Sequence, residues 1–457
     1  MEGEPKQNLP RKRVLVIAYY WPPAGGPGVQ RWLKFTKYLP ENGWQPELLV
    51  PQGAAYPVLD DSLAQEVDHN LAVHRVPIFE PYEAVMNLYK GSGKAERLGS
   101  VASKDEQQSW TQYAMLWGRG NLLLPDPRVL WRRKATKAAA HILRSALEEG
   151  RPFDAIATTG PPHSVHLIGL ALKKKWDIPW LADFRDLWRE MDYLEDFHPT
   201  PRTRRRHLEM ERAVVNTADF KTYSSPSTLF SLAPDKRPET LSKFELIYNG
   251  WDQDDLEDAS HRARTGSEEE AVFQLGHFGS LFPTRDAPGL WKAIRQWNAN
   301  LGETRKRIHL NLAGTASRPV VSSLKEHMRA EDWTDHGYLS HGDAVTMMQR
   351  MDALLLIQND NDTGRKAIPG KAFEYLATQR PIGVIVPMPS DLGDLATSWQ
   401  LKPCAHNDMD SAMEMLATLQ SSKGVDPAIG TQFSRRSLTG QLARCLDGMI
   451  QHPSTRS

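Results

Sequence analysis

The sequence predicts an α/β protein of two Rossmann-like domains, each a doubly wound parallel sheet. Strand-like apolar runs alternate with helix-like segments from Val14 to about Ser225, and the alternation resumes from about Phe273 to Val386. Such alternation is typical of parallel sheets wrapped by helices, and its interruption indicates two sheets. The length of 457 residues also indicates two domains, because it exceeds the length that a single hydrophobic core can organise. No period of about 20–50 residues recurs, so a solenoid is not expected.

The strands follow from short apolar runs that end at glycine, proline or polar residues. In the first domain we expect them at 13–18, 46–50, 72–76, 154–157 and 179–183, and in the second at 273–278, 308–312, 335–338, 353–357 and 382–386. The expected domain bounds are 1–225 and 265–430, with the polar, proline-containing stretch 226–264 as hinge. Residues 431–457 are expected to form a helix that packs back towards the N-terminal domain.

Composition narrows the class of protein. Lys plus Arg and Asp plus Glu both number 56, so no basic field draws the chain to nucleic acid. The cysteines Cys404 and Cys445 cannot form a disulfide framework or a structural zinc site, which fits a reducing cytoplasm. No apolar run approaches the ~20 residues of a membrane span, and Met1 to Arg13 lacks the apolar core of a signal peptide. A cytoplasmic protein is expected.

The stretch 349–387 is the most informative one. It contains a buried strand, a polar loop, a short helix from Gly370 to Ala377 and a second buried strand, which together make a βαβ unit. Ligands of α/β sheets bind where such a loop enters its helix, and free backbone N–H groups near Gly370 suit a phosphate. Glu374 follows one turn later, where a carboxylate can accept hydrogen bonds from sugar hydroxyls. The alternative is that Glu374 is only a solvated helix residue.

This stretch resembles the donor-sugar motif of the retaining nucleotide-sugar glycosyltransferases of family 4 (glycosyl transferase group 1), which have the GT-B fold. In that family two glutamates eight positions apart flank the loop and helix, and the second holds the ribose of a nucleotide diphosphate sugar. Glu374 matches the second glutamate, whereas the position of the first is Lys366. A lysine three residues before the retained glutamate, here Lys371, resembles one branch of the family. The resemblance implies two domains facing each other across a cleft.

A glycine-rich turn follows the first strand. Glycines there let the backbone approach a ligand closely, although such a turn by itself is often only turn geometry. Family 4 enzymes carry a similar Gly-Gly loop that faces the donor diphosphate, and Gly25 and Gly26 match it. The turn has neither the spacing of a dinucleotide fingerprint nor the ending of a P-loop, so a dinucleotide oxidoreductase is disfavoured.

Two further strand ends in the first half carry polar side chains. His163 follows the fourth strand and could hydrogen-bond sugar hydroxyls or transfer a proton, whereas His166, one turn on, fits a buried structural histidine. Asp183, Arg185 and Asp186 crowd the end of the fifth strand, where mutual salt bridging is the simpler account. The combined pattern resembles the acceptor side of the same glycosyltransferase branch. The resemblance therefore makes His163, Asp183 and Arg185 the catalytic candidates.

In the second half, Gly276 to Arg285 resembles the family's first C-terminal strand and turn, where an arginine and a lysine hold the diphosphate. Gly279 matches, Ser280 replaces the arginine, and Arg285 occupies the lysine position. Arginine binds phosphate in a bidentate manner, so one cationic contact is kept. The donor-binding candidates are Gly25, Gly26, Gly279, Arg285, Gly370, Lys371 and Glu374. No metal site is expected, and no cofactor beyond the nucleotide diphosphate sugar as co-substrate.

The segment from Glu80 to Trp131 is less regular and holds Trp110 and Trp117 beside several arginines. These aromatics could contact a membrane that carries a lipid-linked acceptor, at the inner face of the membrane, or they could cover the N-terminal core. Arg202 to His207 holds four arginines, a run that is usually a solvated helix face but could also meet anionic lipid.

The sequence thus predicts a metal-independent retaining glycosyltransferase that moves a sugar from a nucleotide donor to a glycan, lipid-linked or small-molecule acceptor. Surface polysaccharide or glycoconjugate synthesis is the common setting in the family. Two alternatives stay open: a GT-B nucleotide-sugar epimerase, and a non-catalytic nucleotide-sugar binding protein, which the missing first glutamate and Ser280 would permit.

Overall fold

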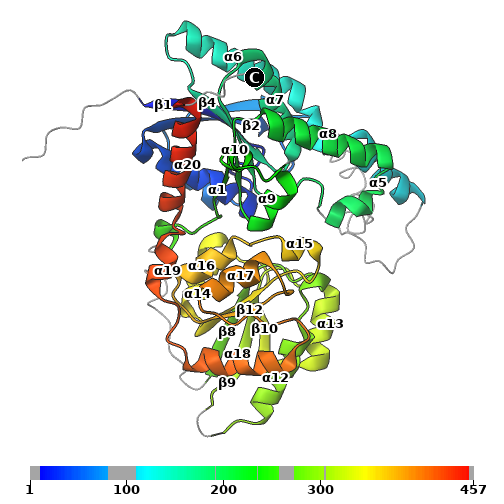
Figure 1. Ribbon diagram of the computed structural model, residues 1–457. Helices are drawn as coiled ribbons and strands as arrows, with labels where there is room; N and C mark the ends of the chain where they lie inside the picture. The colour runs from blue at the N-terminus through cyan, green and yellow to red at the C-terminus, as the bar shows by residue number, and fades with distance from the viewer. Residues whose placement is uncertain are drawn as a thin grey trace, which may run out of the picture. The chain divides into compact units, whose positions relative to one another are not determined.

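The computed structural model describes residues 11–80, 110–190, 192–233, 235–256, 272–302 and 305–451. The chain divides into two compact units. Unit 1 comprises Met1–Tyr223, Thr228–Ile247 and Thr439–Ser457, and unit 2 comprises Ser224–Ser227 and Tyr248–Leu438. The last helix, α20 (Arg435–Gln451), begins in unit 2 and continues in unit 1 (Figure 1).

Unit 1 is built on a parallel sheet of seven strands in the order β3-β2-β1-β4-β5-β6-β7. The strands are β1 (Lys12–Ile17), β2 (Trp44–Gln52), β3 (Val73–Pro77), β4 (Ala155–Gly160), β5 (Trp180–Phe184), β6 (Phe220–Tyr223) and β7 (Phe244–Leu246). Strand β1 lies between β2 and β4, with Val14 opposite both Pro46 and Ala155. The chain winds outward in one direction from β1 and in the other from β4, so the switch point of this sheet lies between those two strands.

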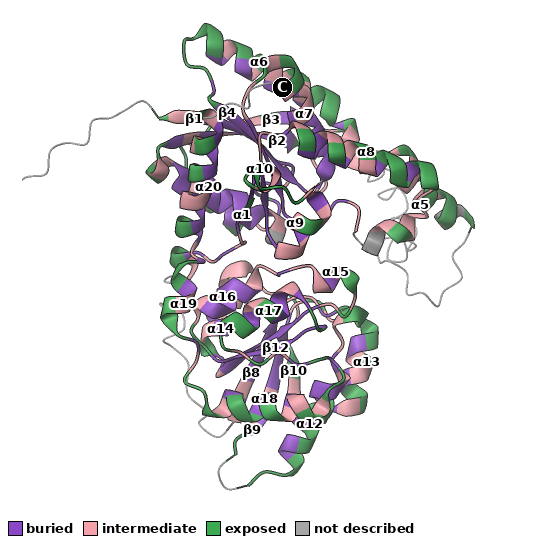
Figure 2. Cartoon of the chain, in the orientation of Figure 1, coloured by how far each residue is buried: buried purple, intermediate pink, exposed green. Residues whose placement is uncertain are grey.

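Helices cover both faces of the unit 1 sheet. They are α1 (Pro27–Tyr38), α2 (Ser62–Gln65), α5 (Trp110–Leu122), α6 (Arg132–Glu148), α7 (His166–Trp176), α8 (Pro201–Thr217), α9 (Pro226–Leu232) and α10 (Pro238–Leu241), with 3-10 turns η1 (Leu39–Asn42), η2 (Pro127–Leu130), η3 (His163–Val165) and η4 (Asp192–Phe197). The alanine face of α6 and the leucines of α7 pack on buried strand residues such as Ile156 and Trp180. The sheet is the most deeply buried part of the unit (Figure 2).

Unit 2 has a parallel sheet of five strands in the order β10-β9-β8-β11-β12. The strands are β8 (Val272–Phe278), β9 (Arg307–Ala313), β10 (Trp333–Asp335), β11 (Ala353–Ile357) and β12 (Ile382–Ile385). The covering helices are α12 (Pro288–Ala299), α13 (Arg318–His327), α14 (His341–Arg350), α15 (Asp362–Arg365), α16 (Lys371–Ala377), α17 (Asp391–Ser398), α18 (Met409–Ser421) and α19 (Pro427–Thr431), with 3-10 turns η5 (Pro283–Arg285) and η6 (Ala330–Asp332). The switch point of this sheet lies between β8 and β11.

The expectation of two parallel α/β sheets is confirmed, and two strands were not expected. Strands β6 and β7 extend the first sheet, and β7 together with α9 and α10 lies within the stretch 226–264 that was expected as a hinge. The expected strand at 335–338 ends earlier, because the ladder with β9 covers Trp333 to Asp335 and Gly337 then adopts a positive φ of 66°. Within the described residues, no helix is both long and apolar enough to cross a membrane.

Candidate functional site

At the switch point of the unit 2 sheet, the amine of Lys371 lies over the end of β8. Its Nζ donates to the Phe278 carbonyl at 3.1 Å and lies 3.5 Å from Nε2 of His277. Nδ1 of His277 lies 2.9 Å from the Leu355 carbonyl and is assigned the proton, so Nε2 faces Lys371 as an acceptor. Burial, and then the charge of Arg285, lower the pKa of Lys371 well below its ordinary value. The fold therefore holds an amine where its charge is poorly compensated.

Gly279 makes room for this amine. Its φ of 131° belongs to a region that L side chains rarely adopt, and a Cβ built on it would lie 2.9 Å from Nζ of Lys371. The backbone N–H of Gly279 donates to the Ala313 carbonyl at 2.7 Å, which fixes the turn after β8. The glycine matched from the sequence is thus required by both its backbone conformation and its neighbour.

Arg285 is the second cation at this edge of the sheet. It ends η5, and its Nη1 donates to the Ser280 carbonyl at 2.9 Å. Its Nε is buried and has no hydrogen-bond partner in the part of the chain that the structure describes. Burial lowers the pKa of Arg285. Neither Arg285 nor Lys371 forms an ion pair with a carboxylate among the described residues, so both retain capacity for an anion.

Glu374 lies one turn beyond Lys371 on α16 and is half-buried. Its carboxylate has no hydrogen-bond or ion-pair partner among the described side chains, and its charge is close enough to oppose the lowering of the Lys371 pKa. The pKa of His341, at the start of α14, is raised. Burial opposes this rise, the hydrogen bond to Asp255 is its largest cause, and the charge of Glu374 adds to it. A free carboxylate at this place suits sugar hydroxyls.

The loop between β11 and α16 is held by its own polar groups. Gln358 is buried, and its Nε2 donates to the Ala367 carbonyl at 2.8 Å, which ties the two ends of the loop together. A Cβ on Gly364 would lie 1.9 Å from the Asn359 carbonyl oxygen, so this position tolerates glycine only. Gly370 precedes α16 as its N-cap residue with no side-chain cap. Sequence reasoning placed Gly370 but did not find Gly364.

The structure therefore gathers the predicted unit 2 residues Gly279, Arg285, Lys371 and Glu374 at one edge of the sheet, with Gly370 at the start of the same helix as Lys371 and Glu374.

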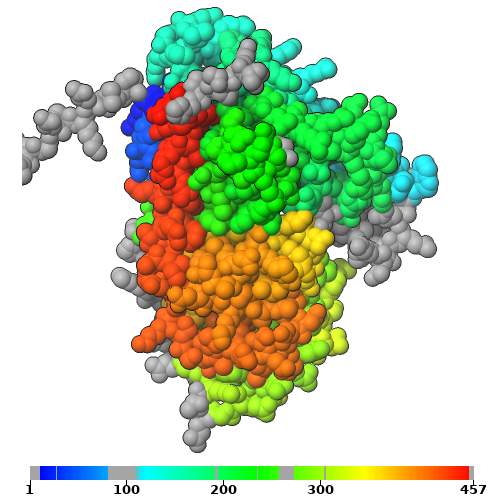
Figure 3. Space-filling view, in the orientation of Figure 1, coloured from blue at the N-terminus to red at the C-terminus, as the bar shows by residue number. Residues whose placement is uncertain are grey.

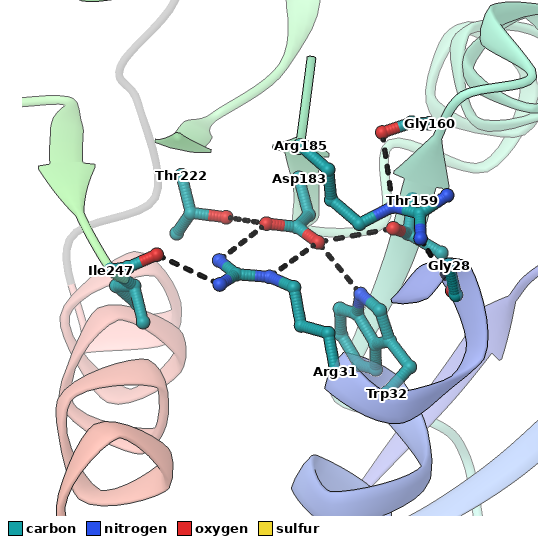
Figure 4. Close-up of polar contacts among 9 residues, drawn as sticks. All are labelled: Gly28, Arg31, Trp32, Thr159, Gly160, Asp183, Arg185, Thr222 and Ile247. Atoms are coloured by element: carbon teal, nitrogen blue, oxygen red, sulfur yellow. Dashed lines mark hydrogen bonds and ion pairs between the residues drawn. The ribbon is translucent and has the colours of Figure 1, made fainter. Parts of the chain in front are cut away.

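In unit 1, Asp183 is completely buried at the end of β5 and its carboxylate is fully engaged (Figure 4). It accepts from Arg31 Nη2 at 2.9 Å and Nε at 3.2 Å, from Trp32 Nε1 at 2.7 Å, from Thr159 Oγ1 at 3.0 Å and from Thr222 Oγ1 at 2.7 Å. Burial alone would raise the pKa of Asp183, but the Arg31 charge and these hydrogen bonds hold it below its ordinary value. Asp183 thus binds α1 to the ends of β4, β5 and β6.

Arg185 joins the two glycine-containing loops at the switch point of the unit 1 sheet (Figure 4). Its guanidinium donates to the carbonyls of Gly28, Gly160 and Pro161. Gly28 belongs to the first turn of α1, two residues after Gly26, and Gly160 ends β4. Arg185 therefore holds the β1–α1 loop against the β4–α7 loop, which indicates that its role is to position these loops.

Gly25 and Gly26 have different reasons to be glycine. The N–H of Gly25 donates to the Val58 carbonyl at 2.9 Å, and a Cβ on Gly25 would lie 3.0 Å from Cγ1 of Val58. Gly26 has a φ of 85°, and a Cβ on it would meet nothing within 4 Å. Gly26 is also the N-cap residue of α1, which leaves the start of a twelve-residue helix without a side-chain cap.

His163 is buried and lies flat against Trp188, with ring centroids 4.7 Å apart and planes 12° apart. Its Nε2 lies 3.3 Å from the Leu187 carbonyl, whereas Nδ1 has no partner in the described part of the chain. Burial, and then the nearby His166, lower the pKa of His163 well below its ordinary value. His163 is therefore a neutral imidazole with one unused nitrogen.

His166 has the buried position that the sequence suggested. Its Nδ1 lies 2.9 Å from Thr158 Oγ1, and its Nε2 has no described partner. A Cβ on Gly160 would lie 2.6 Å from this Nε2 and 2.9 Å from Nδ1 of His163, so both unused nitrogens lie against Gly160 and leave no room for a side chain there. Burial lowers the pKa of His166 to about 3.

Asp186, the other acid at this strand end, is half-buried and carries no hydrogen bond from a described residue. Burial raises its pKa, and the Arg185 charge opposes that rise. In the described part of the chain, no group of three or more His, Cys, Asp or Glu side chains is placed to hold a metal ion.

With this geometry in view, comparison with solved structures identifies the architecture. An α,α-trehalose-phosphate synthase (UDP-forming) from Burkholderia vietnamiensis matches with a TM-score of 0.61 and 10% identity, over 96% of this chain and 99% of that one. This chain has the GT-B fold. An N-terminal domain of trehalose-6-phosphate phosphatase from Candida albicans matches at TM-score 0.57 and 11% identity, over 98% of this chain and 99% of that one.

A UDP-N-acetylglucosamine 2-epimerase of Listeria monocytogenes, described as such provisionally, matches this GT-B chain with a TM-score of 0.54 and 10% identity, over 97% of this chain and 98% of that one. At such identities the likeness shows the fold alone. No family model and no curated protein matches the sequence.

Proposed function

We propose that this protein is a retaining, metal-independent glycosyltransferase that uses a nucleotide diphosphate sugar as donor. The observation that carries the proposal is the pair of cations Lys371 and Arg285, both without a carboxylate partner among the described residues, at the switch point of the unit 2 sheet. Buried cations without counter-ions are costly to the folded state and are kept where an anion binds. The GT-B architecture supports the same assignment.

The donor fits this edge of the sheet in a definite order. The diphosphate would lie against Lys371 and Arg285, close to the turn at Gly279, and Glu374 would accept hydrogen bonds from the ribose. Helix α16 has only seven residues, so its dipole adds little and the two cations supply most of the attraction. As the sugar leaves, the same cations would stabilise the charge that develops on the diphosphate.

Unit 1 would supply the acceptor side, with His163, Asp183 and Arg185 as its proposed residues. Asp183 and Arg185 act in this proposal by positioning, because their polar atoms already bind α1 and the two loops. His163 would contact an acceptor hydroxyl through Nδ1, which is buried and has no described partner. Gly25 and Gly26 would let the backbone approach the donor diphosphate. Retention needs no enzymic nucleophile when the acceptor attacks from the face of the leaving group. A glycan, lipid-linked or small-molecule acceptor, a cytoplasmic location and a role in surface glycan synthesis belong to the same proposal.

The test is thermal-shift screening of the purified protein against UDP-, GDP-, ADP- and dTDP-sugars, repeated with Glu374→Ala. We expect one nucleotide class to raise the melting temperature and the substitution to remove most of that shift. Glu414→Ala is the matched control, because Glu414 is an exposed glutamate on α18 of the same unit. No shift with any donor, or equal shifts in Glu374→Ala and wild type, would contradict the proposed donor site.

A GT-B epimerase acting on a nucleotide sugar is the second candidate, and Asp186 is the observation that favours it. Its half-buried carboxylate has a raised pKa and carries no described hydrogen bond, so it could accept or donate a proton. Product analysis separates the two functions. An epimerase converts the donor in the absence of acceptor to its stereoisomer, whereas a transferase releases nucleoside diphosphate only as acceptor is consumed.

A further inference from the structure

Unit 2 has a hollow of about 740 Å³ at the amino ends of its strands. Asp352 directly precedes β11, Pro381 directly precedes β12 and Lys306 directly precedes β9, and all three line the hollow. Because the strands are parallel, this is the opposite edge of the sheet from Lys371, which lies over the carboxyl end of β8. The hollow is therefore separate from the proposed donor site, and its volume falls within the roughly 300–1,000 Å³ of small-molecule sites.

The charge of this hollow is strongly positive. One acid, Asp352, is part of the described lining, and its Oδ2 is already engaged because it accepts from the Gln274 N–H at 2.7 Å. The described lining also holds four cations, which are Arg305, Lys306, Arg380 and Lys423. None of these cations forms an ion pair with a described residue. An excess of three positive charges therefore lines one space, in a protein whose formal net charge is zero.

The acids that neighbour this lining in the sequence do not remove the excess. Glu414 on α18 and Asp426 at the start of α19 are exposed and are not part of the lining. Glu303, two residues before Arg305, lies outside the described residues. When Glu303 is counted against the lining, positive charge is still in excess.

The walls of the hollow are tied to one another. The Lys306 N–H donates to Oε1 of Gln420 at 3.2 Å, and Nε2 of Gln420 donates to the Lys306 carbonyl at 2.8 Å. A Cβ on Gly424 would lie 1.9 Å from the Gln379 carbonyl oxygen, so the chain after α18 touches the chain before β12. Figure 3 shows α18 in orange beside the yellow-green α12, whose Trp297 is also part of the lining. The hollow is thus held in shape by contacts within unit 2.

The two arginines are held in ways that leave most of their N–H donors available. The Arg305 guanidinium lies over the indole of Trp297, with its Cζ 4.5 Å from the ring centroid. Stacking uses the face of a guanidinium and leaves the N–H groups at its edge. Nη2 of Arg380 donates to the Gln349 carbonyl at 2.6 Å, which uses one of its several donors. Planar guanidinium edges of this kind match phosphate oxygens in a bidentate manner.

We propose that this hollow binds a small anion that carries two linked phosphate groups. A phosphate group carries up to about 2 negative charges at neutral pH, so one group leaves part of the excess of three positive charges unbalanced and two groups balance it. A nucleic acid strand would need a basic surface that extends beyond the hollow, and the chain as a whole has no net charge. Inorganic diphosphate and a nucleoside diphosphate both offer the required chemistry. The proposal does not depend on the proposed transferase activity, since it concerns the opposite edge of the sheet.

The experiment is calorimetric titration of the full-length protein with inorganic diphosphate, with ADP and with inorganic phosphate. Both diphosphates should bind more tightly than phosphate, and their binding should weaken as salt is added. Equal affinities for the two diphosphates would support inorganic diphosphate as the ligand, whereas tighter binding of ADP would support a nucleotide. Because Lys371 and Arg285 also suit a diphosphate, the titrations are repeated in Lys371→Met, where binding at the hollow should persist. Hydrogen exchange should show protection at 378–381 and 420–424.

Two double variants test the cations of the hollow. Arg305→Gln combined with Arg380→Gln should weaken diphosphate binding at least about tenfold, the loss of one hydrogen bond to a charged group. Both side chains are exposed, so folding is not endangered. Lys306→Gln combined with Lys423→Gln should weaken the binding several-fold and make it less sensitive to salt.

The matched control is Arg144→Gln combined with Arg133→Gln on α6 of unit 1. Both arginines are exposed, and Arg144 lies over Trp176, 5.9 Å from the ring centroid, as Arg305 lies over Trp297. This variant should bind diphosphate like wild type. Equal weakening in the control, no diphosphate binding in Lys371→Met, or protection confined to 279–285 and 370–374 would each overturn the proposal. Phosphate binding as tight as that of the diphosphates would overturn the assignment of two phosphate groups.

Discussion

Lys371 illustrates how a functional demand conflicts with stability at a single residue. Its amine is held by one carbonyl and lies near the cation Arg285, and burial lowers its pKa. A bound diphosphate would supply the missing negative charge. We therefore expect Lys371→Met, which keeps the length and removes the charge, to weaken donor binding by about 1.5–3 kcal/mol, the range for a hydrogen bond to a charged group.

The same substitution should not lower the stability of the ligand-free protein, because it removes a poorly compensated charge. Calorimetric titration with the donor found by screening gives the affinity, and urea unfolding without donor gives the stability. Lys325→Met, an exposed position on α13, provides the comparison. Unchanged donor affinity in Lys371→Met would remove this amine from the proposed site.

Asp183 represents the opposite case, in which a buried charge is fully satisfied. Replacing it by asparagine would leave the Arg31 guanidinium without its counter-ion in a place that is 1% exposed. We expect Asp183→Asn to lower the free energy of unfolding by about 3–5 kcal/mol, as when one partner of a buried pair is removed. Urea unfolding measures the loss, and Asp235→Asn, in an exposed pair with Arg237, should show no measurable change. A loss no larger than that of the control would mean that the carboxylate is kept for chemistry alone.

The sequence predicted the strand ends at which several of these residues lie, but it did not predict their roles. Asp183 and Arg185 could be found because polar residues at the ends of buried strands share one edge of a parallel sheet. Lys371 was found through the resemblance of its helix to a family motif. The partners of Asp183 could not be found in this way, because Arg31 and Trp32 lie about 150 positions earlier and meet it only through the β1–β4 neighbourhood. Burial also decides whether an acid is free to bind a ligand, and burial cannot be read from a pattern of residue types.

At the scale of elements, helix α7 and strand β5 pack through a glycine. A Cβ on Gly169 would lie 2.4–2.7 Å from three atoms of the Trp180 indole, and Trp180 is completely buried. We expect Gly169→Ala to destabilise the protein by about 1–3 kcal/mol through overpacking, in spite of the better helix propensity of alanine. Thermal unfolding measures the effect. Gly118→Ala on α5, where a Cβ would meet nothing within 4 Å, should be neutral or stabilising. Equal melting temperatures of Gly169→Ala and wild type would contradict the packing described.

Strands with long apolar runs were predictable, whereas short ones were not. Strand β11 is entirely buried and reads as an uninterrupted apolar run. Strand β7 has three residues, contains Glu245 and is at the edge of its sheet, so its sequence resembles a loop. Strand β6 contains the buried Lys221, whose pKa burial lowers to about 8. Both strands are specified by pairing with their neighbours rather than by local pattern.

At the scale of the whole molecule, both units keep histidines buried in the neutral form. His163 and His166 lie in unit 1 and His277 in unit 2, and burial is the largest cause of the lowered pKa in all three. A histidine in an unfolded chain has a pKa of about 6.5. Below about pH 6.5 these histidines bind protons in the unfolded chain but not in the folded one. The stability that the neutral histidines contribute is therefore present above about pH 6.5 and is lost as the pH falls. For His166 the loss continues down to its folded pKa of about 3.

We therefore expect the free energy of unfolding to fall between pH 7 and pH 5, with each such histidine contributing up to about 1.4 kcal/mol per pH unit once its unfolded form is protonated. Urea unfolding across this range gives the slope, and His166→Gln should reduce it by the share of one proton while keeping a hydrogen-bonding side chain near Thr158. His141→Gln, at an exposed position of α6, should leave the slope as in wild type. If His166→Gln and wild type gave parallel stability curves, His166 would have to bind its proton at the same pH in the folded and the unfolded protein, which would contradict the buried neutral form described above.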